Sequence, residues 1–160
     1  MGQTISQDEL ILQRREWKRN GQRVVFASGR FDLLHPGHIR LLEQARSCGD
    51  ILVVGLASDA TIAAQEGRGR PITPAEERAE ILAALAAVDF VAEYAGNSAR
   101  AMIAQLAPDV VVRGGEAGSQ ESSFREDDEV RSAGGEVIRI PLEPGHSTAG
   151  LIERITQVKA

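Results

Sequence analysis

Two of the chain's three histidines, His35 and His38, lie three residues apart with Pro36 and Gly37 between them. Imidazoles this close can bind a metal together, cap a helix, or donate hydrogen bonds to an anion such as phosphate. Zinc-binding histidines on a helix usually lie four residues apart, and only His146 is a candidate third ligand. No cysteine or obvious carboxylate accompanies the pair, so we favour phosphate binding and assign no metal ligands to the protein.

Four polar loops rich in Gly, Arg, His, Ser and Thr follow apolar runs of the chain. They read SGRFDLLHPGH (28–38), SDATIAAQEGRGRP (58–71), VRGGE (112–116) and EPGHST (143–148). Glycines let a backbone approach an anion, N–H groups at helix starts attract it, and arginine binds phosphate oxygens in pairs. The motifs G-x-G-x-x-G and G-x-x-x-x-G-K-[ST] are not found in these loops, which argues against a nicotinamide oxidoreductase and a P-loop NTPase.

The elements that would position these loops alternate between apolar runs of strand type and amphipathic helical patterns. The predicted strands are 23–27, 51–57, 89–94, 108–115 and 135–142, and the predicted helices are 6–20, 35–50, 74–88, 97–107 and 147–158. A loop with a short helix is expected over 116–133. This alternation predicts an α/β fold: a Rossmann-like, doubly wound, five-stranded parallel sheet with strand order 3-2-1-4-5 and helices on both faces. Ligands of such sheets bind outside the carboxyl ends of the strands, where the polar loops lie.

We expect one domain over residues 1–160, with an N-terminal helix within 1–20 and the α/β core over 22–157. Ser6 and Glu9 have the spacing of a helix capping box. Thr73 is predicted to cap a second helix, with Pro74 at its first position. The single cysteine, Cys48, is interpreted as a packing residue.

Composition and charge exclude several classes of function. The chain has 160 residues, is 42% hydrophobic and carries a net charge of −5. An acidic protein lacks the basic surface that nucleic acids and anionic membranes require. No apolar run approaches the ~18 residues of a membrane span, and the N-terminus lacks the order of a signal peptide, so a cytoplasmic protein is expected. A homodimer is left open.

Four segments carry a resemblance to a known family. They are RVVFASGRFDLLHPGH (23–38), GRPITPAEERAEILAALAAVDFV (69–91), APDVVVRGGE (107–116) and GGEVIRIPLEPGHST (134–148). The H-x-G-H motif resembles that of the cytidylyltransferase-like nucleotidyltransferases, and the order and spacing of all four segments resemble the heptose 1-phosphate adenylyltransferases among them. The chain departs from this branch at Arg30, where cysteine is usual, and at Ala57, where asparagine is usual. It also has Arg113 for lysine and Ala149 for threonine.

The resemblance implies transfer of AMP from ATP to a sugar 1-phosphate with release of pyrophosphate, and Mg²⁺ as the ion that accompanies the phosphates. His35, His38 and Arg113 would then stabilise the charge of the reacting phosphates. The residues expected at the nucleotide are Ser28, Gly29, Arg30, Phe31, Asp32, Gly37, Gly114, Ser147 and Thr148, and those expected at the acceptor are Asp59, Arg68, Arg70 and Arg78.

Each assignment has a structural alternative. Ser147 can simply cap a helix, Asp32 can bond the backbone of its own turn, and Arg78 can pair with neighbouring glutamates. Arg113 can be a solvated surface residue, and Arg68 and Arg70 can be mere turn residues. The competing functions are a cytidylyltransferase acting on a small polyol or amino-alcohol phosphate, and a nucleotide-binding domain without catalysis.

Overall fold

The computed structural model describes residues 1–115 and 121–158, apart from the side chains of 121–124. The described part forms one parallel sheet of six strands in the order β1-β4-β3-β2-β5-β6. The strands are β1 (Gln3–Thr4), β2 (Val24–Gly29), β3 (Ile51–Ala57), β4 (Phe90–Tyr94), β5 (Val110–Gly114) and β6 (Glu136–Ile140). The order β4-β3-β2-β5-β6 is the predicted 3-2-1-4-5, which is confirmed.

The prediction of five strands is wrong by one. The additional strand, β1, pairs Gln3 with Phe90 and Thr4 with Val91 at the edge of the sheet. Two residues are too few to show the alternation of apolar and polar side chains by which a strand is recognised.

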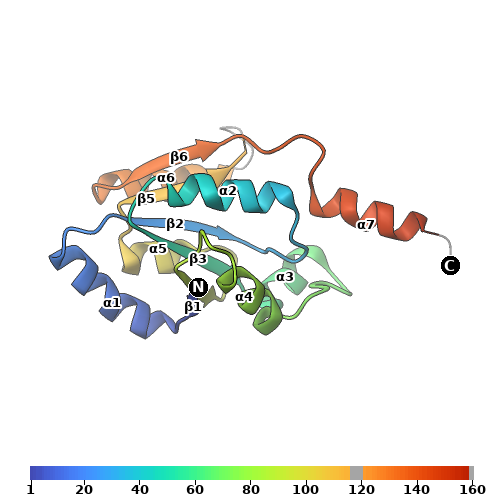
Figure 1. The fold of residues 1–160 in the computed structure, drawn as a ribbon, viewed down its shortest axis with the longest axis horizontal. Coiled ribbons are helices and arrows are strands. Elements are labelled where there is room, and N and C mark those ends of the chain that lie inside the picture. The colour runs from blue at the N-terminus through green and yellow to red at the C-terminus, as the bar shows by residue number, and fades with distance from the viewer. Residues whose placement is uncertain (116–120, 159–160) are drawn as a thin grey trace.

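Helices cover both faces of this sheet (Figure 1). They are α1 (Gln7–Arg19), α2 (Pro36–Arg46), α3 (Asp59–Glu66), α4 (Ala75–Ala83), α5 (Arg100–Leu106), α6 (Glu121–Ser132) and α7 (Thr148–Gln157). Leu42 of α2 and Leu82 of α4 pack into the core on one face, and Leu10 of α1 and Met102 of α5 pack into the core on the other. All seven residues of β3 are buried as a result, and both cores consist mainly of aliphatic side chains.

Two helices differ from the prediction. The segment 58–71, expected as a loop, contains α3, which Ser58 caps by accepting a hydrogen bond from the Thr61 N–H. The segment 121–132 is the whole of α6 rather than a short helix within a loop, while residues 116–120 of that expected loop lie outside the described residues.

Helix capping is predicted correctly at one position and wrongly at another. The capping box of Ser6 and Glu9 is present in full. Thr73, in contrast, is not the cap of α4: Pro74 occupies that position without a side-chain hydrogen bond. The backbone of Thr73 is engaged elsewhere, because its N–H donates to Asp32 and its carbonyl accepts from Arg78.

The last helix, α7, extends away from the body of the molecule, beyond the carboxyl ends of the strands (Figure 1). None of its residues is buried. Its first turn is therefore the part of the helix closest to the polar loops. Within the residues that the structure describes, no helix is both long and apolar enough to cross a membrane.

Candidate active site

The two histidines of the H-x-G-H motif stack against each other at the start of α2. Their ring centroids are 3.8 Å apart with 25° between the ring planes. His35 occupies the N-cap position without a capping bond from its side chain, and Pro36 begins the helix. A Cβ atom on Gly37 would lie 3.0 Å from the His35 ring, so glycine leaves room for that ring.

The surroundings of both imidazoles favour their neutral form at pH 7. Burial lowers the pKa of His35, and the nearby His146 lowers it further. Burial, followed by the charge of His35, lowers the pKa of His38 from 6.5 to about 4. Within the described part of the chain, both Nδ1 atoms are buried without a hydrogen-bond partner. An Nδ1–H there would lack an acceptor, so we infer that the proton resides on Nε2 and that Nε2–H is the donor each ring offers.

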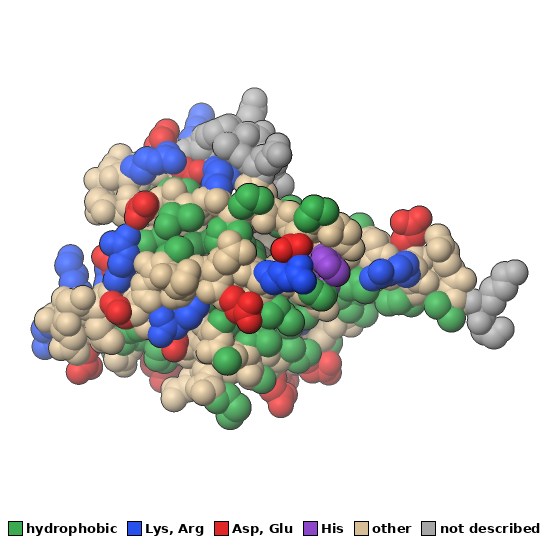
Figure 2. Space-filling model, turned by 45° about the horizontal axis from the view of Figure 1, so that its top comes forward, with side chains coloured by type: hydrophobic (Ala, Val, Ile, Leu, Met, Phe, Trp, Pro, Cys, Tyr) green, Lys and Arg blue, Asp and Glu red, His purple; other side chains and the backbone are tan. Residues whose placement is uncertain are grey.

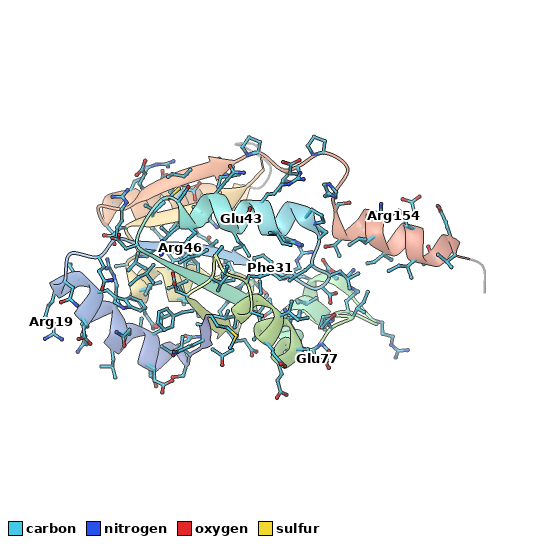
Figure 3. All side chains as sticks on the ribbon, viewed as in Figure 1. Arg19, Phe31, Glu43, Arg46, Glu77 and Arg154 are labelled. Atoms are coloured by element: carbon cyan, nitrogen blue, oxygen red, sulfur yellow. The ribbon has the colours of Figure 1, made fainter. Side chains whose placement is uncertain are left out.

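Phe31 supports this pair from the end of β2. Its backbone adopts a left-handed φ of 49°, and its ring is buried and meets His38 edge-on at 5.2 Å. A Cβ atom on Gly29 would be 3.0 Å from the Phe31 ring, so Gly29 makes space for it. Figure 3 shows Phe31 between α2 and α4. The role found for this side chain is therefore packing beneath the histidines.

Asp32 joins the first polar loop to the second. Its carboxylate accepts hydrogen bonds from the backbone N–H groups of Ile72 and Thr73 and from the Arg70 guanidinium at 2.8 Å. Burial alone would raise the pKa of Asp32, but these bonds outweigh it and the pKa lies below its ordinary value. The carboxylate therefore stays ionised and holds the loop that precedes α4 against the end of β2.

A cavity of about 230 Å³ opens beside the histidines. Its lining consists of Arg30, Phe31, Asp32, His38, Glu66, Arg70 and Thr148. All except Glu66 are residues that the sequence predicts for the site. Glu66 pairs with Arg30 and lies 2.7 Å from Arg70. The sequence signal for it was the spacing of Glu66 and Arg70, four residues apart, in a segment interpreted as a loop.

Arg78 is a buried support under the cavity, and neither it nor its half-exposed partner Asp59 lines that cavity. Arg78 is 1% exposed and donates to the carbonyls of Thr73, Arg30 and Ala57. Its Nη2 also donates to Asp59 at 2.6 Å. Arg78 thus joins the ends of β2 and β3 to the start of α4, and its expected contact with the acceptor remains a prediction.

The remaining predicted residues lie around the same edge of the sheet. Ser147 caps α7 by accepting from the Gly150 N–H at 3.0 Å, while Thr148 reaches the cavity. Arg113 pairs with Glu126 at 2.8 Å and Asp127 at 2.9 Å. Like Ser147 and Arg113, the other four are outside the cavity lining: Ser28 and Gly29 end β2, Gly114 ends β5, and Arg68 is exposed on the loop after α3. Figure 2 shows a histidine at the surface beside basic and acidic side chains, near the base of the projecting arm.

Known proteins resemble this chain in sequence and in fold. The sequence matches the family described as cytidylyltransferase-like over residues 26–151, from β2 to the first turns of α7. The chain belongs to this family. The match spans the histidine pair, the cavity and Ser147, so the resemblance predicted from the sequence is confirmed for the family.

Curated relatives of this cytidylyltransferase-like chain include two bifunctional proteins HldE. The protein from Rhodopseudomonas palustris (strain BisB5) is 42% identical over 149 residues, which are 93% of this chain and 30% of the relative. The protein from Hyphomonas neptunium is 43% identical over 150 residues, 94% of this chain and 30% of the relative. The chain thus spans about 30% of the length of these relatives.

Solved structures show the same fold. A lipopolysaccharide core biosynthesis protein from Thermoplasma volcanium superposes with a TM-score of 0.63 at 26% identity, covering 77% of this chain and 98% of that protein. A pantoate-β-alanine ligase from Francisella tularensis superposes with a TM-score of 0.68 at 15% identity, covering 100% of this chain and 74% of the ligase. The second likeness concerns the fold alone.

Proposed function

We propose that this domain transfers AMP from ATP to a sugar 1-phosphate of the heptose 1-phosphate type and releases pyrophosphate. The observation that carries the proposal is the stacked histidine pair beside a cavity that two arginines and the first turn of α7 line. Family membership and the relatives named HldE support the same class of reaction. The other activity of a bifunctional relative is not part of this proposal.

The reaction forms a bond between an oxygen of the acceptor phosphate and the α-phosphorus of ATP. The bond from that phosphorus to the oxygen bridging to the β-phosphorus breaks, and the electron pair leaves with pyrophosphate. A phosphate monoester has its second pKa near ~6, so the nucleophile is already ionised and requires no strong base. The protein must instead hold two anions in line and neutralise their charge.

In this proposal His35 and His38 serve as donors. Their Nε2–H groups bind oxygens of the α-phosphate and stabilise the charge that develops during transfer. Neutral rings can stack at 3.8 Å, whereas two imidazolium ions at that distance would repel each other. The phosphate charge will itself raise the pKa of a bound histidine, so one ring can gain a proton as the substrate arrives.

The N-terminus of α7 and the end of β2 would hold the phosphates of ATP. Backbone N–H groups of Gly29 to Phe31 and the first turn of α7 attract anions, and Thr148 adds a hydroxyl at the cavity. Ser147 has its oxygen engaged with Gly150 but keeps its hydroxyl hydrogen as a donor. Arg113 would reach a phosphate only by exchanging Glu126 or Asp127 for it, with Gly114 beside it at the end of β5.

The described residues do not fit a Mg²⁺ site made by the protein. They contain no group of three or more His, Cys, Asp or Glu that could hold a metal. Asp32, the most central carboxylate, already accepts bonds at both oxygens. We therefore propose that Mg²⁺ enters as part of the substrate, MgATP, with phosphate oxygens and water as its ligands.

Pyrophosphate release tests this function directly. The purified domain is incubated with ATP or CTP and a panel of acceptors: heptose 1-phosphates, hexose 1-phosphates, glycerol 3-phosphate and phosphoethanolamine. We expect turnover with ATP and a heptose 1-phosphate, reduced by ~10²–10³-fold in His35→Ala and His38→Ala. Turnover with CTP and a polyol or amino-alcohol phosphate would establish the rival function, and nucleotide binding without any turnover would identify a non-catalytic domain.

A further inference from the structure

The cavity contains two carboxylates that are held in different ways. Asp32 is fixed by backbone N–H groups and by Arg70, and its side chain is 1% exposed. Glu66 is 17% exposed, and within the described residues its partners are the side chains of Arg30 and Arg70. Its Oε2 lies 2.7 Å from Arg70 Nη2, yet it is a buried atom without an aligned hydrogen bond. Glu66 is therefore the carboxylate that a bound anion can displace from the two arginines.

The position of Glu66 on its helix indicates the same. It is the last residue of α3, and Gly67 follows as the C-cap with a φ of 88°. The carbonyl end of a helix is its negative end and disfavours a carboxylate. Arg30 and Arg70 must therefore attract Glu66 enough to offset its unfavourable place on α3.

The charges of the cavity balance before a substrate binds. Arg30 and Arg70 are opposed by Glu66 and Asp32, and the histidines are neutral. A phosphate dianion entering this space needs guanidinium groups that are not already neutralised. Since Asp32 is tied to the backbone, Glu66 is the partner that Arg30 and Arg70 can exchange.

We propose that Glu66 is an internal substitute for a phosphate group. In the free protein it holds the Arg30 and Arg70 guanidinium groups together, and the phosphate of the acceptor displaces it when it binds. This inference rests on the proposed function, which places ATP against the histidines, the backbone of residues 29–31 and the first turn of α7. It moves the Arg30 side chain, expected at the nucleotide, to the acceptor beside Arg70. Glu66 then sets the specificity: a dianionic phosphate monoester competes with it effectively, whereas a monoanionic or neutral acceptor does not.

Binding of inorganic phosphate to Glu66→Gln tests the proposal. Titration calorimetry is done with the nucleotide site saturated by a non-hydrolysable ATP analogue, so that phosphate reports on the acceptor side. Removing the competing charge should tighten phosphate binding roughly tenfold relative to the wild type. Glu66→Ala should show the same gain, which keeps the test valid if one variant folds poorly.

The matched control is Glu77→Gln, which removes one negative charge from the exposed face of α4. Figure 3 shows Glu77 directed away from the body of the molecule, and its phosphate affinity should equal that of the wild type. The gain of Glu66→Gln should disappear when Arg30→Gln is added, because that guanidinium is what Glu66 releases. Unchanged or weaker phosphate binding in both Glu66 variants, or an equal gain in Glu77→Gln, would overturn the proposal.

This test separates the two proposals because phosphate binding requires no turnover. Suppose that the Glu66 variants bind phosphate tenfold more tightly but the protein transfers no nucleotide to any sugar phosphate. This result would support displacement of Glu66 and reject the proposed reaction. Turnover of a heptose 1-phosphate with no gain in the Glu66 variants would do the opposite. In an active enzyme, Glu66→Gln should also lower KM for the acceptor several-fold and leave KM for ATP unchanged.

Discussion

The fold should lose stability between pH 6.5 and pH 4 because of one histidine. Burial moves the pKa of His38 from 6.5 in the unfolded chain to about 4 in the folded protein, and the stacked His35 contributes to this shift. Between these values the unfolded chain binds a proton that the folded protein does not. The contribution of His38 to the free energy of unfolding is therefore fully present above pH 6.5. It is lost as the pH falls from 6.5 through 4.

The magnitude follows from the pKa difference. A fall in the pKa of His38 from 6.5 to about 4 would change the free energy of unfolding by about 3 kcal/mol if the ring were fully shielded from water. The ring is only partly buried, and solvent reduces the effect, so we expect about 1–2 kcal/mol. His35 acts in the same direction, because burial and His146 lower its pKa too. Asp32 also has a lowered pKa, but its effect on stability falls below pH 3.8, its ordinary pKa, and so outside this pH range.

Urea unfolding at several pH values between 7 and 4 measures the effect, with His38→Asn as the comparison because asparagine does not titrate. The free energy of unfolding should fall by about 1–2 kcal/mol more in the wild type than in the variant. The C–H resonances of the imidazole, followed by NMR, give the pKa directly. A His38 that titrates near 6.5, or equal pH dependence in both proteins, would refute the burial argument.

Three further outcomes follow from the site. Gly37→Ala should lower kcat/KM roughly 10–100-fold by displacing the His35 ring. Thermal unfolding should change little, because the helix preference of alanine offsets the crowding by its Cβ atom. Equal activity would contradict the close packing. Arg78→Ala should cost about 3–5 kcal/mol in urea unfolding, because it leaves three carbonyls without their donor. Arg19→Ala at the exposed end of α1 should cost almost nothing, and similar losses in both variants would reject the supporting role. Ser147→Ala should lower the free energy of unfolding by about 1 kcal/mol, because the cap of α7 is lost, and should raise KM for ATP. A loss of stability with an unchanged KM would restrict Ser147 to capping.

The sequence predicts the sheet well because its strands are continuous apolar runs. Runs such as 51–57 can only be buried on both faces, and their alternation with helices determines the parallel order. β1 escapes prediction because it is an edge pairing, made by contact with β4 and not by a pattern of its own. The helix α3 escapes because glycines after it and polar residues within it resemble a loop.

The candidate site is predictable to the extent that its residues follow strands. Arg30, Asp32 and His38 are found because the loop after the first buried strand is where a ligand binds in such folds. What cannot be read from the sequence is which charges pair. Arg78 and Arg113 have the same side chain, yet one is a buried support of the loops and the other is bound to carboxylates of α6.

Asp32 fastens two segments some 40 residues apart in the chain, and it does so mainly through main-chain N–H groups. These hydrogen bonds therefore form with any side chain at positions 72 and 73, provided that neither residue is proline. One wall of the pocket can change its chemistry from one protein to another while the distance between the walls stays the same. Variation in substrate choice among related chains is thus expected in the 67–73 segment, with the carboxylate at position 32 kept as the fixed point.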